Sequence, residues 1–188
     1  MITNQVSLIV KNKFLTGVMS SFLAVFTLFS ANCWSVELNS LIIQAKDIHP
    51  LLETQQLSRE SIRHISFDVL HDNPQYSGDI KFVNAIARSS SQGKLNGKNI
   101  RSALYALYNA GKDLGFYGLD TKNNRDAEQL EIKLRKIWSH NISIGRANVY
   151  RKGTVLVVIW HDGATKDVWK AINTKVLNTL GKANPVNG

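Results

Sequence analysis

The feature that most limits what this chain can fold into is an uncharged apolar stretch near its N-terminus. Residues 14–30 carry no charge, Lys11 and Lys13 precede them, and small residues follow. A basic, an apolar and a small-residue segment in this order are typical of a secretory signal peptide. The bilayer accepts the apolar part as a helix while the lysines stay on the cytoplasmic side. We therefore expect residues 1–35 to direct export and to stay outside the folded core.

The fate of this leader allows three interpretations. Cleavage near Ser35 would remove Cys33, the only cysteine of the chain. A retained membrane anchor is the second interpretation, because the stretch reaches only the lower end of the roughly 17–25 residues that span a bilayer. Lipidation of Cys33 is the third, but Ser30 and Asn32 stand where lipoprotein signals carry a leucine and a small residue. A cysteine-free mature chain suits an oxidising compartment, so we expect a periplasmic or secreted protein of a bacterial envelope.

The remainder of the chain has the length and composition of one globular domain. The chain has 188 residues, of which 44% are hydrophobic and 20% charged, and both values are ordinary for a folded protein. No internal repeat is visible. Serine, glycine and asparagine gather near residues 89–98, which predicts an exposed loop. We expect a single domain over residues 36–188.

Apolar periodicity predicts more helix than strand. The segments with helical spacing are 37–47, 58–70, 78–88, 99–113, 124–138 and 166–180. Residues 115–118 are expected to form a tight turn. Only 142–150 and 154–161 have the β-branched and aromatic content of strands, and Gly153 between them predicts a β-hairpin.

The expected fold is therefore α+β. It is a mainly helical single domain with a C-terminal β-hairpin in a small antiparallel sheet, followed by a final helix. A hairpin alone is not a stable sheet, so one more strand is needed, and residues 65–70 are the candidate for it.

The positive charge of the chain allows two interpretations, solubility of the folded protein or attraction to an anionic partner. The net charge is +9, from 23 lysines and arginines against 14 aspartates and glutamates. One basic cluster surrounds the predicted loop and consists of Lys94, Lys98 and Arg101. A second cluster is expected at the hairpin, and its binding residues are Arg146, Tyr150, Arg151 and Lys152.

An acidic protein surface is the partner that these clusters predict, and an anionic envelope polymer is the alternative. Aromatic residues between the clusters resemble the pattern of single-stranded nucleic-acid binding. An exported protein meets protein and envelope polymers instead, so nucleic acid is not the expected partner. Contact with a membrane is expected only through an uncleaved leader.

Three polar residues are candidates for catalysis: His161, Asp162 and His140. A histidine at the end of a buried strand, next to a carboxylate, could act as a general base. The alternative interpretation is a polar strand end followed by an Asp-Gly turn. His140 can equally end the helix that precedes it.

No metal site or cofactor is predicted. His64, Asp68 and His71 share one face of a predicted helix, but they lack the compact HExxH arrangement of zinc enzymes. Neither a nucleophile elbow nor a phosphate-binding glycine loop is present in the sequence.

The sequence thus predicts an exported, non-enzymatic binding protein that acts on a protein partner, for example as an inhibitor or immunity protein. The alternatives are a small envelope hydrolase that uses His161 with Asp162, or a structural envelope component anchored by its leader.

Overall fold

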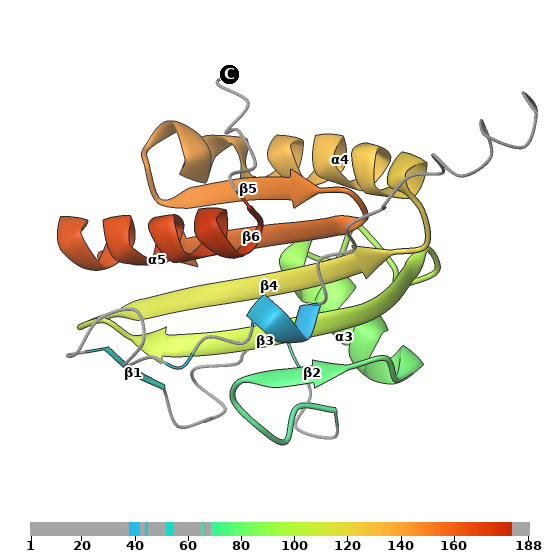
Figure 1. The fold of residues 1–188 in the computed structure, drawn as a ribbon, viewed down its shortest axis with the longest axis horizontal. Helices are drawn as coiled ribbons and strands as arrows, with labels where there is room; N and C mark the ends of the chain where they lie inside the picture. The colour runs from blue at the N-terminus through green and yellow to red at the C-terminus, as the bar shows by residue number, and fades with distance from the viewer. Residues whose placement is uncertain (1–37, 42–43, 45–51, 55–64, 66–68, 182–188) are drawn as a thin grey trace, which may run out of the picture. The chain divides into compact units, whose positions relative to one another are not determined.

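Six strands form one antiparallel sheet at the centre of the protein (Figure 1). The structure is a computed structural model that describes residues 38–41, 44, 52–54, 65 and 69–181. The strands are β1 (Glu53–Thr54), β2 (Gln75–Ser77), β3 (Ile100–Asn109), β4 (Asp113–Thr121), β5 (Ala147–Lys152) and β6 (Val155–His161). Their order across the sheet is β1-β3-β4-β6-β5, and β2 also pairs with β3.

Helices cover both faces of this sheet, so the described fold has three layers. The helical elements are η1 (Leu38–Leu41, a 3-10 helix), α3 (Ile80–Ser90), α4 (Asn124–Ser143) and α5 (Lys166–Thr179). Apolar side chains of α3 and α4 pack on one face, and those of η1 and α5 pack on the other. Figure 1 shows α5 and η1 in front of the sheet and α3 behind it.

The prediction of a mainly helical domain with only a small sheet is wrong, and the segment 99–113 is the main cause. This segment forms β3 and not a helix. All residues from Ala103 to Tyr108 are buried, because a strand between two helical layers is apolar on both faces. Such a strand loses the alternation of a half-exposed strand, and its spacing then matches a helix by coincidence.

The turn predicted at residues 115–118 is also wrong, because these residues lie inside β4. Two glycines in this strand make room for neighbours. A Cβ atom on Gly115 would lie 2.2 Å from the indole of Trp160, and one on Gly118 would lie 2.9 Å from Leu38. Glycine here serves close packing across a strand.

Other elements follow the prediction closely. The helices expected at 78–88, 124–138 and 166–180 are confirmed as α3, α4 and α5, and the hairpin is confirmed as β5–β6. Each helix begins at a residue whose side chain accepts backbone hydrogen bonds from the first turn, namely Asp79, Asn123 and Thr165. Helix α4 runs five residues beyond its predicted end, to Ser143.

The strand candidate at 65–70 is not supported by the residues that the structure describes there. Ile65, Val69 and Leu70 lie in neither a helix nor a strand. The strands that complete the sheet are β1, β2, β3 and β4.

Side chains bond to the backbone on both sides of the sheet, at β3 and at β5. On the β3 edge, the amide of Asn73 donates to the carbonyl of Leu107 at 2.6 Å and accepts from its N–H at 2.8 Å. Asn73 thereby fills the place in the ladder between β1 and β2. On the β5 edge, Arg135 of α4 donates to the carbonyl of Val149 at 2.7 Å. Charged side chains and covering helices of this kind prevent edge-to-edge association.

The predicted leader, residues 1–35, lies outside the described residues, as do Cys33, His64 and Asp68. The described residues all belong to one compact unit, Ser35–Gly188. None of the helices in the described part of the chain has the length and apolar character needed to span a bilayer.

Candidate functional site

His161 stands at the end of β6, and both of its ring nitrogens have partners. Nδ1 accepts hydrogen bonds from the backbone N–H groups of Gly163 and Ala164, each at 3.0 Å. Nε2 lies 3.2 Å from the carbonyl oxygen of Gly145 and therefore carries the proton in this neutral tautomer. The ring also packs against Trp169, with 4.5 Å between ring centroids. His161 thus holds the turn after β6 in place and has no free nitrogen for a substrate.

The other two catalytic candidates do not complete a site with His161. The backbone N–H of Asp162 donates to the carbonyl of Asp113, while its side chain is exposed. His140 is exposed in the last turn of α4. None of the three lines the cavity beside α4 or the one at Arg88, Ser89, Gln92 and Gly93. Within that same part of the chain, no group of three metal-ligating side chains occurs.

The basic residues predicted at the hairpin are divided between its two ends. Arg146 precedes β5, whereas Arg151 lies at the far end of the strand, so about 17 Å of extended chain separates them. Arg151 is also neutralised: its Nε lies 2.7 Å from Glu131 and its guanidinium 3.8 Å from Glu128, both on α4. The hairpin therefore presents less positive charge than its sequence indicates.

Tyr150 and Lys152 are also engaged in the fold. Tyr150 is 7% exposed, and its hydroxyl donates to the side chain of Asn173 on α5. Burial raises the pKa of this phenol. The ammonium of Lys152 lies beside Gly181, just after α5. Arg146 is the one residue of the four whose side chain is classed as exposed.

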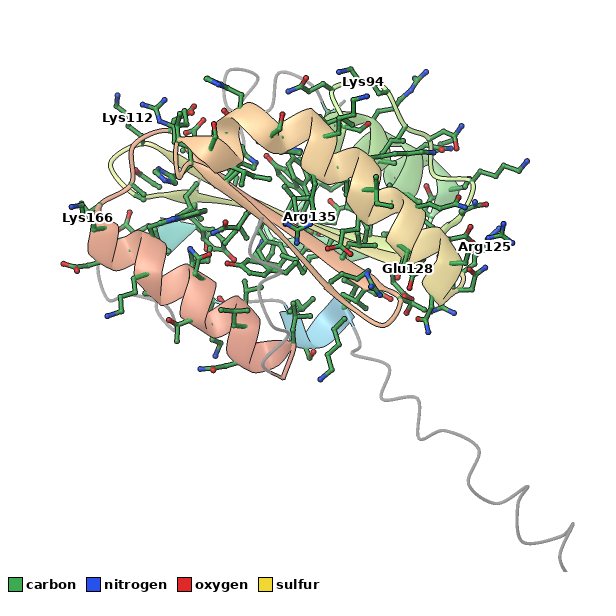
Figure 2. All side chains as sticks on the ribbon, turned by 90° about the horizontal axis from the view of Figure 1, so that it is seen from above. Lys94, Lys112, Arg125, Glu128, Arg135 and Lys166 are labelled. Atoms are coloured by element: carbon green, nitrogen blue, oxygen red, sulfur yellow. The ribbon has the colours of Figure 1, made fainter. Side chains whose placement is uncertain are left out.

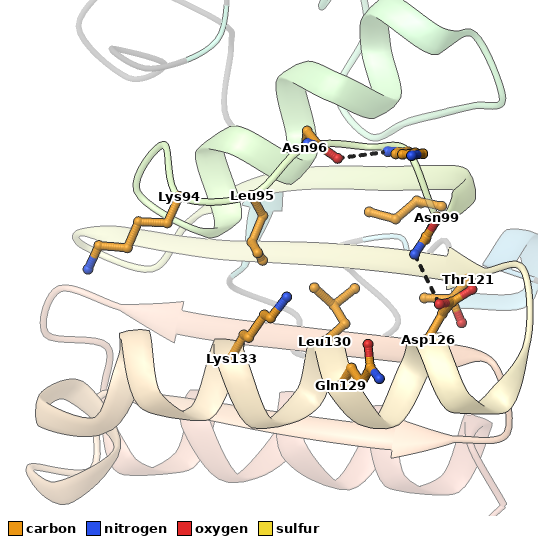
Figure 3. Close-up of a pocket in the computed structure, with 11 residues that line it drawn as sticks. Lys94, Leu95, Asn96, Asn99, Thr121, Asp126, Gln129, Leu130 and Lys133 are labelled. Carbon is orange, nitrogen blue, oxygen red and sulfur yellow. Dashed lines mark hydrogen bonds between the residues drawn. The ribbon is translucent and has the colours of Figure 1, made fainter.

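A different basic surface lies between α4 and the segment that joins α3 to β3. A cavity of about 230 Å³ opens there, lined by residues between 94 and 100 on one side and by α4 on the other (Figure 3). We call it the lysine groove, after Lys94, Lys98 and Lys133. Each of these lysines is exposed, and the ion pairs found among the described residues do not involve them.

Short-range hydrogen bonds hold the loop side of the groove in shape. Ser91 donates to the carbonyl of Ala87 at 2.6 Å and accepts from the N–H of Leu95 at 2.9 Å. The N–H of Gly97 donates to the side chain of Asn84 on α3 at 2.8 Å. A Cβ atom at Gly97 would lie 2.7 Å from Val83, so only glycine allows the loop to lie this close to the helix.

The end of the groove at Lys94, which we call the basic end, has no carboxylate among the lining residues, whereas Asp126 lies at the other end beside Asn99, the residue after Lys98. Figure 3 shows Lys94 at one end and Asp126 at the other, with Lys133 extending from α4 toward Leu95. Asp126 is held by two amide donors, Asn99 at 3.0 Å and Asn123 at 2.8 Å. Three lysines and one hydrogen-bonded aspartate leave the groove with an excess of positive charge.

Arg101, the third member of the loop cluster predicted from the sequence, does not belong to the groove. Its guanidinium donates twice to Asp120 on β4, at 2.9 Å each, and also to Thr154. The hydrogen bond to Asp120 raises the pKa of the Arg101 guanidinium above its usual value. Arg101 thus fixes the start of β3 to its neighbours.

The α4 side of the groove could not be predicted from the sequence. Gln129 and Lys133 are four residues apart on one helix face, but nothing in the sequence indicated that residues 94–99 would lie along it. Comparisons of the chain with models of protein families, with curated proteins and with solved structures find no match.

Proposed function

We propose that this chain is an exported, non-enzymatic binding protein that recognises an acidic partner protein through the lysine groove. An inhibitor or immunity protein for an envelope enzyme is the concrete form of this function. The export part of the proposal rests on the leader sequence, and the binding part rests on the geometry of the groove.

The unpaired lysines of the groove are the observation that carries the proposal. Lys94, Lys98 and Lys133 surround one cavity without acidic partners among the described residues. At the hairpin, by contrast, Glu131 and Glu128 already neutralise Arg151. Exposed positive charge that the fold does not use attracts acidic surfaces and accelerates their association. The groove is therefore better suited to a partner than the hairpin.

The hydrolase alternative loses support from the surroundings of His161. A general base needs a nitrogen lone pair directed at the substrate, and the lone pair on Nδ1 accepts two backbone N–H groups instead. Since His161 is not free to act as a base, Asp162 has no catalytic histidine to orient.

A capture experiment with matched variants tests the binding function. The groove variant is K94E/K98E/K133E. The control variant, K112E/K166E/K170E, changes the net charge equally at exposed lysines elsewhere. Figure 2 shows Lys112 and Lys166 at the opposite side of the view from Lys94 and Arg125. A hairpin variant, R146E/K152E, compares the two basic surfaces.

We expect a specific envelope protein to be recovered with the wild-type, control and hairpin variants and lost with the groove variant. Loss with the hairpin variant alone would move the site to the hairpin, and equal recovery with all four would refute charge recognition. The N-terminal sequence of the exported protein tests the leader: a start near Val36 supports cleavage, and a start at Met1 refutes it.

A further inference from the structure

The lysine groove has an apolar floor beneath its charged rim. Leu95 and Leu130 are half-buried, pack against the core and line the cavity. Ile100, which is 5% exposed, lines it as well. A purely electrostatic site would not need this floor, because long lysine side chains can attract anions from any surface.

The size of the cavity limits what can enter it. Sites for drug-sized ligands and cofactors usually measure about 300–1,000 Å³, and this cavity is smaller, at about 230 Å³. A single side chain of a partner is a better match than a cofactor. Three of the eleven lining residues are apolar, namely Leu95, Ile100 and Leu130, so an entering side chain gains from an apolar part that covers them.

The charged groups at the two ends of the lysine groove determine which charges the partner can carry on either side of the entering side chain. Lys94 and Lys133 favour carboxylates at the basic end. At the other end, Asp126 repels a carboxylate of the partner. The oxygens of Asp126 already accept hydrogen bonds from the amides of Asn99 and Asn123. A uniformly charged polymer, such as a phosphate backbone, would place negative charge against Asp126.

We propose that the lysine groove binds an acidic peptide segment of the partner, in which one leucine-sized side chain enters the cavity. Carboxylates on one side of that residue pair with Lys94 and Lys133, and uncharged residues lie over Asp126. This inference rests on the proposed binding function and adds the kind of segment that is recognised.

Synthetic peptides test this inference without knowledge of the natural partner. The probe is a labelled peptide, Glu-Glu-Glu-Leu-Ser-Ser-Ser, made in both chain directions. One comparison peptide has serine in place of leucine, one has glutamine in place of glutamate, and one carries glutamate throughout. Fluorescence anisotropy measures binding to the purified protein and to its variants K94E/K98E/K133E and K112E/K166E/K170E.

We expect one direction of the leucine peptide to bind at least about tenfold more tightly than each comparison peptide, the effect of roughly 1.4 kcal/mol. The groove variant should lose this binding and the control variant should keep it. Methyl signals of Leu95 and Leu130 in NMR spectra should shift with the leucine peptide and stay in place with the serine peptide.

The possible failures separate this inference from the function on which it rests. If the leucine, serine and all-glutamate peptides bind with equal affinity and the groove variant binds none of them, the apolar anchor is refuted. Recognition of an acidic partner by the groove would still stand. Tighter binding of inorganic polyphosphate than of any peptide would overturn the peptide ligand. Binding that survives in the groove variant would overturn the groove itself, and with it the proposed function.

Discussion

A methyl group added at Gly115 is expected to destabilise the protein by about 1.5–4.5 kcal/mol, because the indole of Trp160 occupies its place. The new Cβ atom would lie 2.2–2.4 Å from three ring atoms, where ordinary contact begins at 3.4 Å. The ring must therefore move by about 1.2 Å, the difference between 3.4 and 2.2 Å. It cannot move freely, since it stacks on Trp138 with 6.5 Å between centroids.

Two contributions make up this magnitude. Overpacking of a filled interior costs about 1–3 kcal/mol, and weakening an aromatic pair costs about 0.5–1.5 kcal/mol. Urea unfolding gives the free energy of unfolding of Gly115→Ala. Near-UV circular dichroism reports whether the Trp160–Trp138 pair has changed. Gly78→Ala is the matched control, because its Cβ atom would approach no closer than 3.4 Å to another group, and we expect less than about 0.5 kcal/mol there.

A double-mutant cycle with Trp160→Val decides the cause. Without the indole, Gly115→Ala should be neutral or should stabilise the protein by up to about 1 kcal/mol, because alanine leaves the unfolded chain fewer conformations than glycine does. An unchanged cost of Gly115→Ala in this background would refute the steric explanation.

Three further predictions concern charge, pH and the sheet edge. Glu131→Gln should reduce the free energy of unfolding by about 1–2 kcal/mol at low salt, because Glu131 pairs with both Arg151 and Arg135 in a position only partly shielded from water; the loss should shrink at high salt, and no salt dependence would contradict it. Burial raises the pKa of Tyr117 above the usual value of about 10 for a tyrosine. Above that pH only the unfolded chain releases this proton, so the free energy of unfolding falls with a slope that approaches about 1.4 kcal/mol per pH unit. Tyr117→Phe should lessen that slope in pH-dependent unfolding, and an unaltered slope would count against the assignment. Asn73→Asp should reduce the free energy of unfolding by about 1–3 kcal/mol, because a carboxylate cannot donate to the Leu107 carbonyl and is repelled by it; a free energy of unfolding equal to that of the wild type would disprove the role of the amide donor.

Local sequence determined the parts of the fold that carry a signal within a few residues. Helix α4 has an amphipathic pattern that is visible in the chain, and the structure shows that it begins at the capping residue Asn123. The β5–β6 hairpin has β-branched strands around Gly153. The apolar leader is equally plain in the sequence, and its role in export stays a prediction.

Strand β3 shows where local sequence is insufficient. Whether a continuous apolar run such as Ala103–Tyr108 forms a buried helix or a central strand depends on what covers it. Here α3, the preceding element, covers one face, and η1, which lies about sixty residues earlier in the chain, covers the other. Coverage of both faces therefore decided that this segment is a strand, and the spacing of its apolar residues could not decide it.

The candidate site follows the same division. Composition alone determined that the protein is basic, and the positions of Lys94 and Lys98 in a polar loop followed from glycine and serine content. Only the tertiary structure decided which basic residues remain unpaired and can meet a partner. It brought Glu131 against Arg151 and left Lys133 beside the loop, because charges pair or remain free according to distances between elements that the chain order does not contain.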